Sequence, residues 1–273
     1  MRNIKLTLEY DGTLYAGWQW QKNALSIQEV LTKALEKMTE EKISLNGASR
    51  TDSGVHALGQ VAAFQTSRNI PCEGFLKGIN NLLPADIRIT DCEEVPLSFH
   101  PTTDAKRKTY LYLLEVGKVP SALLKDRVWW VGPKLDIEAM EEASRCLIGE
   151  HDFKSFRGAR SDIKTTVRRI DKIEIGQRTT DNGQRTKKDA ARFWSVVRCP
   201  LSIVHSPLSA VPLSFTGTGF LKYMVRNMVG TLVAVGIGKF SPKDVKGILE
   251  AKDRTQAGPT APPQGLYLVK VDY

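Results

Sequence analysis

A run of thirteen residues, Gly47-Ala48-Ser49-Arg50-Thr51-Asp52-Ser53-Gly54-Val55-His56-Ala57-Leu58-Gly59, combines small residues with a guanidinium, a carboxylate and an imidazole, and it lies between a helical pattern upstream and a strand pattern downstream. The three glycines of this stretch let the backbone turn sharply or approach another group closely. Arg50 and Asp52 are two residues apart, so an extended backbone would aim both side chains the same way. Such a loop can present a reactive carboxylate. An aspartate in a glycine-rich loop more often caps backbone N–H groups, and spacing alone leaves both interpretations open.

The segments on either side of this stretch have clear local patterns. Upstream, Ser26-Ile27-Gln28-Glu29 is a capping box followed by apolar residues at helical spacing, which predicts a helix over residues 27–39. Downstream, residues 60–66 form an apolar run typical of a strand. At the N-terminus, residues 4–10 alternate between apolar and polar, which predicts a half-buried strand ending at the turn Asp11-Gly12.

The remaining patterns predict an α+β fold of two similar halves, residues 1–104 and 105–273. In the first half a helix over 74–83 and a strand over 87–95 complete the order strand, helix, loop, strand, helix, strand. This order favours helices packed on one face of a mostly antiparallel sheet. In the second half we predict strands at 170–175, 193–199 and 266–271, helices at 136–147 and 220–235, a charged loop at 149–157, and a flexible basic loop near 176–192.

Composition favours a nucleic-acid partner and argues against a zinc site. The 273 residues are 41% hydrophobic, carry a net charge of +9 and have a pI near 9.3, so we expect an anionic partner. The four cysteines are widely separated, without the spacing of a zinc site, and we interpret them as reduced thiols. No metal or cofactor is predicted.

The chain is expected to be cytoplasmic. Met1-Arg2-Asn3-Ile4-Lys5 runs directly into the first strand pattern and lacks the apolar core of a signal peptide. The longest apolar segment, Phe220 to Ile237, contains Lys222, Arg226 and Asn227, which argues against a membrane span.

Two segments combine aromatic with polar or basic residues. Residues 15–21 could be a hydrophobic plug for the sheet or a surface that stacks on bases. Lys106-Arg107-Lys108 precedes a strand in which Tyr110 and Tyr112 share one face. This pattern suits a phosphate backbone with a base stacked beside it, and equally a basic strand edge with tyrosines in the core.

Three further residues have side chains whose charge or ring nitrogens would need a partner in the folded protein. Arg226 lies on a very apolar predicted helix, and because an unpaired buried guanidinium is costly, we expect a carboxylate partner. His151 lies between Glu150 and Asp152, which admits a metal ligand or a general base, but a structural loop histidine is favoured without a second ligand cluster. His56 is interpreted as structural support for its loop.

Motifs in order along nearly the whole chain resemble those of the tRNA pseudouridine synthases of the TruA family. Each motif alone is weak, but the complete series is specific. The motifs are Tyr10-Asp11-Gly12, Gly17-Trp18-Gln19, Arg50 to Ala57, Phe99-His100, Tyr110, Gly149 to Phe153, Ser155-Phe156-Arg157, Met224 to Gly230, Ala257 to Pro262 and Gly265-Leu266.

The resemblance implies a role for each site residue. Asp52 would be the nucleophile, Tyr110 would stack on the target uracil, Arg226 would pair with the Asp52 carboxylate, and Arg50 would hold the displaced nucleotide. RNA binding would fall to Lys106, Arg107, Lys108 and Gln19. The implied fold joins the two halves across a central cleft with helices on the outer face. The implied protein is a homodimer that modifies the anticodon stem-loop of tRNA without a cofactor.

The chain also departs from the family pattern in places. Pro101-Thr102 follows Phe99-His100 where many members have an arginine, Tyr223 replaces a frequent histidine, and Pro263-Gln264 alters the last loop. Lys106 and Lys108 stand where arginine is frequent, and lysine keeps the charge but loses the bidentate fork.

Two other functions stay open at this point. One is a catalytically silent tRNA-binding protein or RNA chaperone of the same fold. The other is a hydrolase acting on a nucleoside or glycoside, which would need a second carboxylate near Asp52 that the sequence does not offer.

Overall fold

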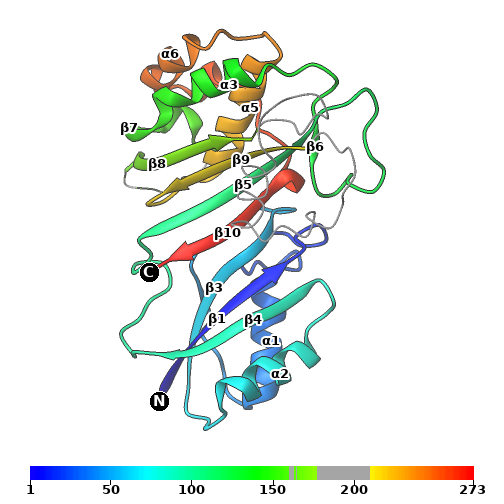
Figure 1. Ribbon diagram of the computed structural model, residues 1–273. Helices are drawn as coiled ribbons and strands as arrows, with labels where there is room; N and C mark the ends of the chain where they lie inside the picture. The colour runs from blue at the N-terminus through cyan, green and yellow to red at the C-terminus, as the bar shows by residue number, and fades with distance from the viewer. Residues whose placement is uncertain (160–162, 164, 177–209) are drawn as a thin grey trace. The chain divides into compact units, whose positions relative to one another are not determined.

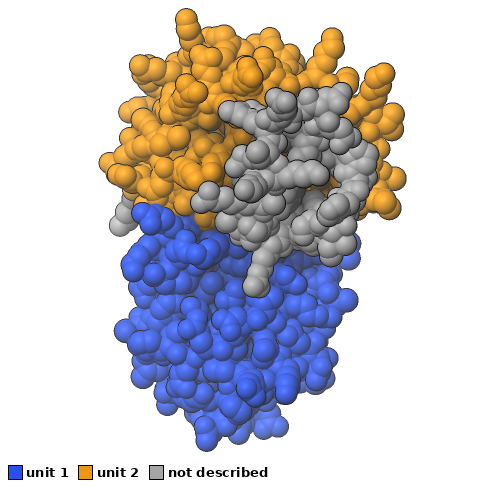
Figure 2. Space-filling model, in the orientation of Figure 1, with its two compact units in different colours: residues 1–108, 267–273 blue, residues 109–266 orange. Residues whose placement is uncertain are grey.

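The computed structural model describes residues 1–159, 163, 165–176 and 210–273. It divides into two compact units, unit 1 with residues 1–108 and 267–273, and unit 2 with residues 109–266 (Figure 2). The expected boundary after residue 104 falls slightly before this division, and the last strand, expected in the C-terminal half, belongs to unit 1. The expected basic loop, from residue 177 on, and the expected strand at 193–199 lie outside the described residues.

Unit 1 is a sheet with two helices (Figure 1). The strand order is β4-β1-β3-β10, with β1 antiparallel to both neighbours, β10 parallel to β3, and the short β2 beside β3. The strands are β1 (Arg2–Tyr10), β2 (Asn46–Gly47), β3 (His56–Thr66), β4 (Ile87–Val95) and β10 (Leu266–Asp272), and the helices are α1 (Ile27–Thr39) and α2 (Cys72–Leu82).

Local sequence explains most of unit 1. The predicted capping at the start of α1 is confirmed, since the Ser26 hydroxyl accepts a hydrogen bond of 3.2 Å from the Glu29 amide. Ile4 of β1 lies opposite Phe64 of β3, and Phe64 packs edge-on against Phe75 of α2 with the ring centroids 5.5 Å apart. The apolar face of the strands is therefore covered by α2.

Unit 2 has the strand order β5-β9-β8-β7, with β6 parallel to β5 and the β9-β8-β7 pairs antiparallel. Helix α3 packs against α5 and α6. The strands are β5 (Arg107–Glu115), which begins at the end of unit 1, β6 (Trp129–Trp130), β7 (Gly149–Asp152), β8 (Val167–Ile175) and β9 (Ala210–Gly217). The helices are α3 (Ile137–Ser144), α5 (Met224–Gly236) and α6 (Asp244–Ala251), with 3-10 turns at Arg145–Leu147, Lys154–Phe156, Arg254–Gln256 and Pro263–Gly265.

The structure corrects two of the predicted elements. Residues 149–152, predicted as part of a loop, form β7, because their backbone pairs with β8. The helix predicted from residue 220 begins only at Met224, because Tyr223 has a left-handed backbone with φ of 61°. Lys222 therefore precedes the helix, and Arg226 lies in its first turn.

The α+β class with a mostly antiparallel sheet is confirmed. Among the residues that the structure describes, no helix combines the length and the apolar character needed to span a membrane.

Candidate active site

Asp52 lies half-buried on the loop between β2 and β3, and the backbone around it is held on both sides. The Thr51 carbonyl accepts a 3.0 Å hydrogen bond from the Trp18 amide, and the Thr51 hydroxyl lies 2.7 Å from the Tyr10 hydroxyl. The Asp52 carbonyl accepts from the Val55 amide at 3.1 Å. The carboxylate is therefore carried by an ordered turn rather than by a loose loop.

The segment after β1 packs backbone to backbone on this loop, and glycine makes the contact possible. Gly17 has φ of +91°, and a Cβ there would lie 2.5 Å from the Thr51 carbonyl oxygen. A Cβ at Gly12 would lie 2.0 Å from the Val55 carbonyl oxygen. Both distances exclude any larger residue without movement of the loop that carries Asp52.

Side chains distant in sequence hold the start of the loop. The buried Gln60 bonds to both the amide and the carbonyl of Ser49, at 3.2 and 2.7 Å. Lys108 Nζ donates to the Ala48 carbonyl at 2.6 Å, and Thr102 Oγ1 donates to the Gly47 carbonyl at 2.8 Å. None of these three roles was predicted from the sequence, although a glutamine inside an apolar strand is a signal that could have indicated Gln60.

We expect Lys108→Met to loosen this loop without unfolding the protein. Burial lowers the pKa of Lys108, so its ammonium is less stable here than in water, and the apolar replacement removes both that cost and the bond to Ala48. A lost anchor worth about 1 kcal/mol should speed amide exchange in residues 48–52 roughly fivefold. Hydrogen exchange read by mass spectrometry measures this.

The matched control is Lys106→Met, which removes the same charge from an exposed position two residues earlier. Its exchange in residues 48–52 should equal that of the unmodified chain. Equal exchange in both variants would show that the Lys108 bond does not hold the loop.

His56 is buried, and its ring contacts β10 and the turn after β1. Its ring stacks on Tyr267 with the centroids 4.8 Å apart, and its Nδ1 lies 3.1 Å from both the Gly12 amide and an Asp11 carboxylate oxygen. A neutral ring accepts the Gly12 N–H, whereas a protonated ring would donate to Asp11. Either bond ties the start of β3 to the turn after β1, which fits the expected structural role.

The aromatic segment at residues 15–21 contains both buried residues, as expected of a hydrophobic plug, and exposed residues, as expected of a surface that stacks on bases. Tyr15 and Trp18 are 5% and 1% exposed and form the plug, whereas Trp20 is 48% exposed. The exposed Gln19 donates to Gln28 Oε1 at 2.8 Å, and the same oxygen accepts from the Trp20 amide at 2.8 Å. Helix α1 thus presents Gln19 and Trp20 to solvent.

In unit 2, Arg226 is oriented by the loop before β10 and by an aromatic ring. Its Nε donates to the Ala261 carbonyl at 2.8 Å, and its guanidinium carbon lies 4.9 Å from the centroid of the Tyr223 ring. Tyr110 on β5 is buried, with its ring edge-on to Phe220 at 5.1 Å. The pairing of Asp52 with Arg226 and the stacking role of Tyr110 stay predictions.

The residue after Arg226 anchors the helix. Asn227 is fully buried, and its side-chain Nδ2 donates to the Phe156 carbonyl at 2.8 Å. Its side-chain Oδ1 accepts hydrogen bonds from Arg254 at 3.0 Å and from the Thr260 hydroxyl at 2.6 Å. This network joins the first turn of α5 to the Ala257–Pro262 motif. The anchoring role of Asn227 was not predicted from the sequence, although a polar asparagine in an apolar helix indicates a buried hydrogen-bonded side chain.

The predicted RNA-binding residues of the basic triplet at 106–108 differ in exposure. Lys106 and Arg107 are exposed, as a phosphate contact requires, whereas Lys108 is committed to Ala48. Arg50 is exposed, and its expected role in holding the displaced nucleotide stays a prediction.

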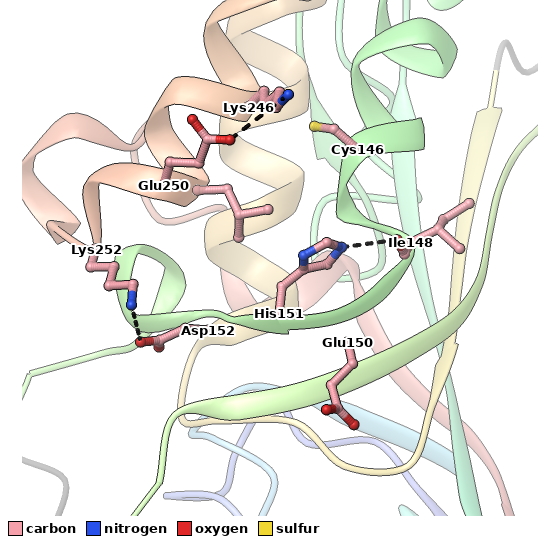
Figure 3. Close-up of a pocket in the computed structure, with 9 residues that line it drawn as sticks. Cys146, Ile148, Glu150, His151, Asp152, Lys246, Glu250 and Lys252 are labelled. Carbon is pink, nitrogen blue, oxygen red and sulfur yellow. Dashed lines mark hydrogen bonds and ion pairs between the residues drawn. The ribbon is translucent and has the colours of Figure 1, made fainter.

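A cleft of about 610 Å³ between β7 and α6 contains His151 (Figure 3). His151 Nε2 lies 2.9 Å from the Ile148 carbonyl and donates to it, and Glu150 points away from the ring (Figure 3). Asp152 pairs with Lys252 at 3.3 Å. Among the described residues no group of three potential ligands is arranged to hold a metal. The bond to Ile148 fits the expected structural loop histidine, and that role stays a prediction.

The protein thus combines an α+β fold, an aspartate on a loop held by distant residues and a net charge of +9. The family model described as "tRNA pseudouridine synthase" matches residues 7–104 and 143–273, so the chain belongs to the tRNA pseudouridine synthase family.

Curated relatives carry one more specific name. The chain is 44% identical over 273 residues to tRNA pseudouridine synthase A of Acetivibrio thermocellus, with 100% of both chains covered. It is 45% identical over 273 residues to the protein of that name from Geobacter sulfurreducens, again with 100% of both covered. Similarity over the full length supports pseudouridine synthesis in tRNA, and not the alternative of a catalytically silent RNA-binding protein.

Proposed function

We propose that this protein is an isomerase that converts uridine to pseudouridine in the anticodon stem-loop of tRNA, at positions 38 to 40, with Asp52 as its nucleophile. The observation that carries this proposal is the braced turn at Thr51 and Asp52. Bonds from Tyr10 and Trp18 hold Thr51, so the backbone that carries the neighbouring carboxylate is fixed, which favours nucleophilic attack on a bound nucleotide.

The reaction rearranges bonds within one nucleotide. The bond between uracil N1 and ribose C1′ breaks, the base turns, and a new bond joins C5 to C1′, while the proton leaves C5 and N1 gains one. The carboxylate assists by attack on C1′ or C6 or by promoting loss of the base. A target within a stem must first leave the base stack, which costs a few kcal/mol that stacking on Tyr110 would offset. Arg226 would keep the carboxylate ionised, since a nearby cation opposes the effect of burial.

Conversion of unmodified tRNA tests this function. Incubation of the purified protein with an unmodified tRNA transcript that has uridines in its anticodon stem-loop should produce pseudouridine there, without added metal or cofactor. Chemical mapping of pseudouridine identifies the modified positions. A transcript in which those uridines are replaced by cytidine is the control. Binding of tRNA without conversion would instead indicate an RNA-binding protein.

We also infer a cytoplasmic homodimer, because the family resemblance implies an RNA site built from two subunits and because tRNA is the expected substrate. Analytical ultracentrifugation at the concentration of the activity assay should give the mass of two chains. Sedimentation as one 30.4 kDa chain would contradict the dimer.

A further inference from the structure

A second pocket of unit 2, about 390 Å³ in volume, is strongly basic. It is separate from the larger cleft, although Lys252 contributes to both. Four of its residues are cationic and one is acidic. The lining residues are Lys154, Arg157, Gly158, Ala159, Lys252, Asp253 and Arg254.

The single carboxylate of this pocket is already engaged. Asp253 accepts hydrogen bonds from the Thr255 amide at 2.9 Å and from the Thr255 hydroxyl at 2.8 Å. These bonds lower the pKa of Asp253, so the carboxylate is ionised and turned toward the 3-10 turn that follows it. Lys252 pairs with Asp152 at 3.3 Å. The Lys154 charge also lowers the Asp253 pKa, although less than the bonds to Thr255 do. Within the described ranges, no ion pair joins Lys154 or Arg157 to a carboxylate.

Arg254 adds a positive charge that its own partners do not neutralise. Its guanidinium donates to the Gly258 carbonyl at 2.9 Å, to the Asn227 side-chain oxygen at 3.0 Å and to the Thr260 hydroxyl at 3.0 Å. All three acceptors are uncharged, and a guanidinium keeps its proton in proteins. The pocket therefore holds an excess of positive charge that an anion would relieve.

Two links connect the pocket to Arg226. Gly158 lines the pocket, donates its amide to the Lys222 carbonyl at 2.8 Å, and lies so close to Tyr223 that a Cβ would be 2.5 Å from the Tyr223 ring. The same ring lies against the Arg226 guanidinium. The other link is the bond from Arg254 to Asn227, the residue that follows Arg226. One aromatic side chain thus separates the pocket from Arg226.

We propose that this pocket binds a backbone phosphate of the RNA strand that carries the target nucleotide, with Arg157 and Lys154 as its direct ligands. This inference rests on the proposed function for its substrate. A guanidinium and an ammonium are the side chains that bind phosphate most often, and phosphate contacts fix the register of a nucleic acid without reading its sequence. The pocket therefore positions the RNA and takes no part in bond making.

Arg157→Gln, Lys154→Gln and the double variant test the pocket, each measured for binding of unmodified tRNA across a range of salt concentrations. Each single substitution should weaken binding roughly tenfold and lower the slope of log affinity against log salt by about 1. The double variant should weaken binding by about 100-fold and lower the slope by about 2, because the effects of two independent contacts add in free energy. At saturating tRNA the rate of pseudouridine formation should stay within about twofold of the unmodified chain.

Lys246→Gln is the matched control, since Lys246 is an exposed lysine of the same unit that lines the other cleft and pairs with Glu250. It removes one positive charge without touching the proposed phosphate site. If the double variant binds tRNA as the control does, with the same salt slope, the pocket holds no phosphate. A lower rate at saturating tRNA with unchanged binding would also overturn the proposal.

The phosphate site and the proposed reaction can be tested independently, because tRNA binding is measured without catalysis. Salt-dependent tRNA binding that the variants weaken, with no pseudouridine formed by the unmodified chain, would remove the proposed reaction and leave the phosphate site. Arg157→Lys adds a further measurement: it should lose less affinity than Arg157→Gln, because it keeps the charge but not the bidentate fork.

Discussion

Asp52→Asn should abolish pseudouridine formation while the folded protein still binds tRNA. The amide has the shape of the carboxylate but cannot act as a nucleophile, so we expect the rate to fall by a factor of about 10⁴ or more. The bonds to Thr51, to Ser49 and to the Asp52 carbonyl do not use the Asp52 carboxylate, so they should survive the substitution. The test uses one preparation of the variant. Pseudouridine mapping measures its activity, a binding isotherm measures its affinity for tRNA, and the thermal midpoint of unfolding measures its stability.

Two comparison variants show whether the effect belongs to Asp52. Asp91→Asn makes the same change at an exposed position on β4 and should keep full activity. Tyr110→Phe keeps the aromatic ring and removes only the hydroxyl, so a purely stacking role predicts substantial activity. If Tyr110→Phe were as inactive as Asp52→Asn, stacking alone would not describe Tyr110. An Asp52→Asn rate within tenfold of normal would rule out the nucleophile assignment.

Gly230→Ala should destabilise the protein strongly, although alanine normally favours a helix over glycine by about 1 kcal/mol. Gly230 lies in the middle of α5, and a Cβ there would sit 1.7 Å from the Pro259 carbonyl oxygen, so the helix and the Ala257–Pro262 loop would have to separate. Overpacking of this kind costs on the order of 3 kcal/mol. The same displacement would disturb the bond from Arg226 to the Ala261 carbonyl, so activity should fall as well.

Gly247→Ala is the matched control for this prediction. Gly247 lies on the exposed face of α6, with nothing within 4 Å of the added Cβ. The same substitution there should stabilise the protein by roughly 0.5–1 kcal/mol. Thermal or denaturant unfolding should therefore show shifts of opposite sign for the two variants. A stabilising effect of Gly230→Ala would mean that α5 and the loop are not in close contact.

The elements of unit 1 whose signals are local could be predicted from the amino-acid sequence alone. The cap at Ser26, the helical spacing that follows it and the alternation in β1 act between residues less than about four positions apart, and these elements formed as predicted. The family motifs likewise predict roles for Asp52, Tyr110 and Arg226, because each motif is a short run of residues that can be recognised before its neighbours in space are known.

The side chains that hold the Asp52 loop and the first turn of α5 became visible only in the tertiary structure. Gln60 reaches Ser49, Lys108 reaches Ala48, and Asn227 joins Phe156 to Arg254, and these partners are separated by long stretches of chain. The left-handed backbone of Tyr223 likewise has no local signal, since the apolar pattern continues through it. Periodicity reports which face of an element is buried, whereas a bond between distant side chains depends on how the chain folds back on itself.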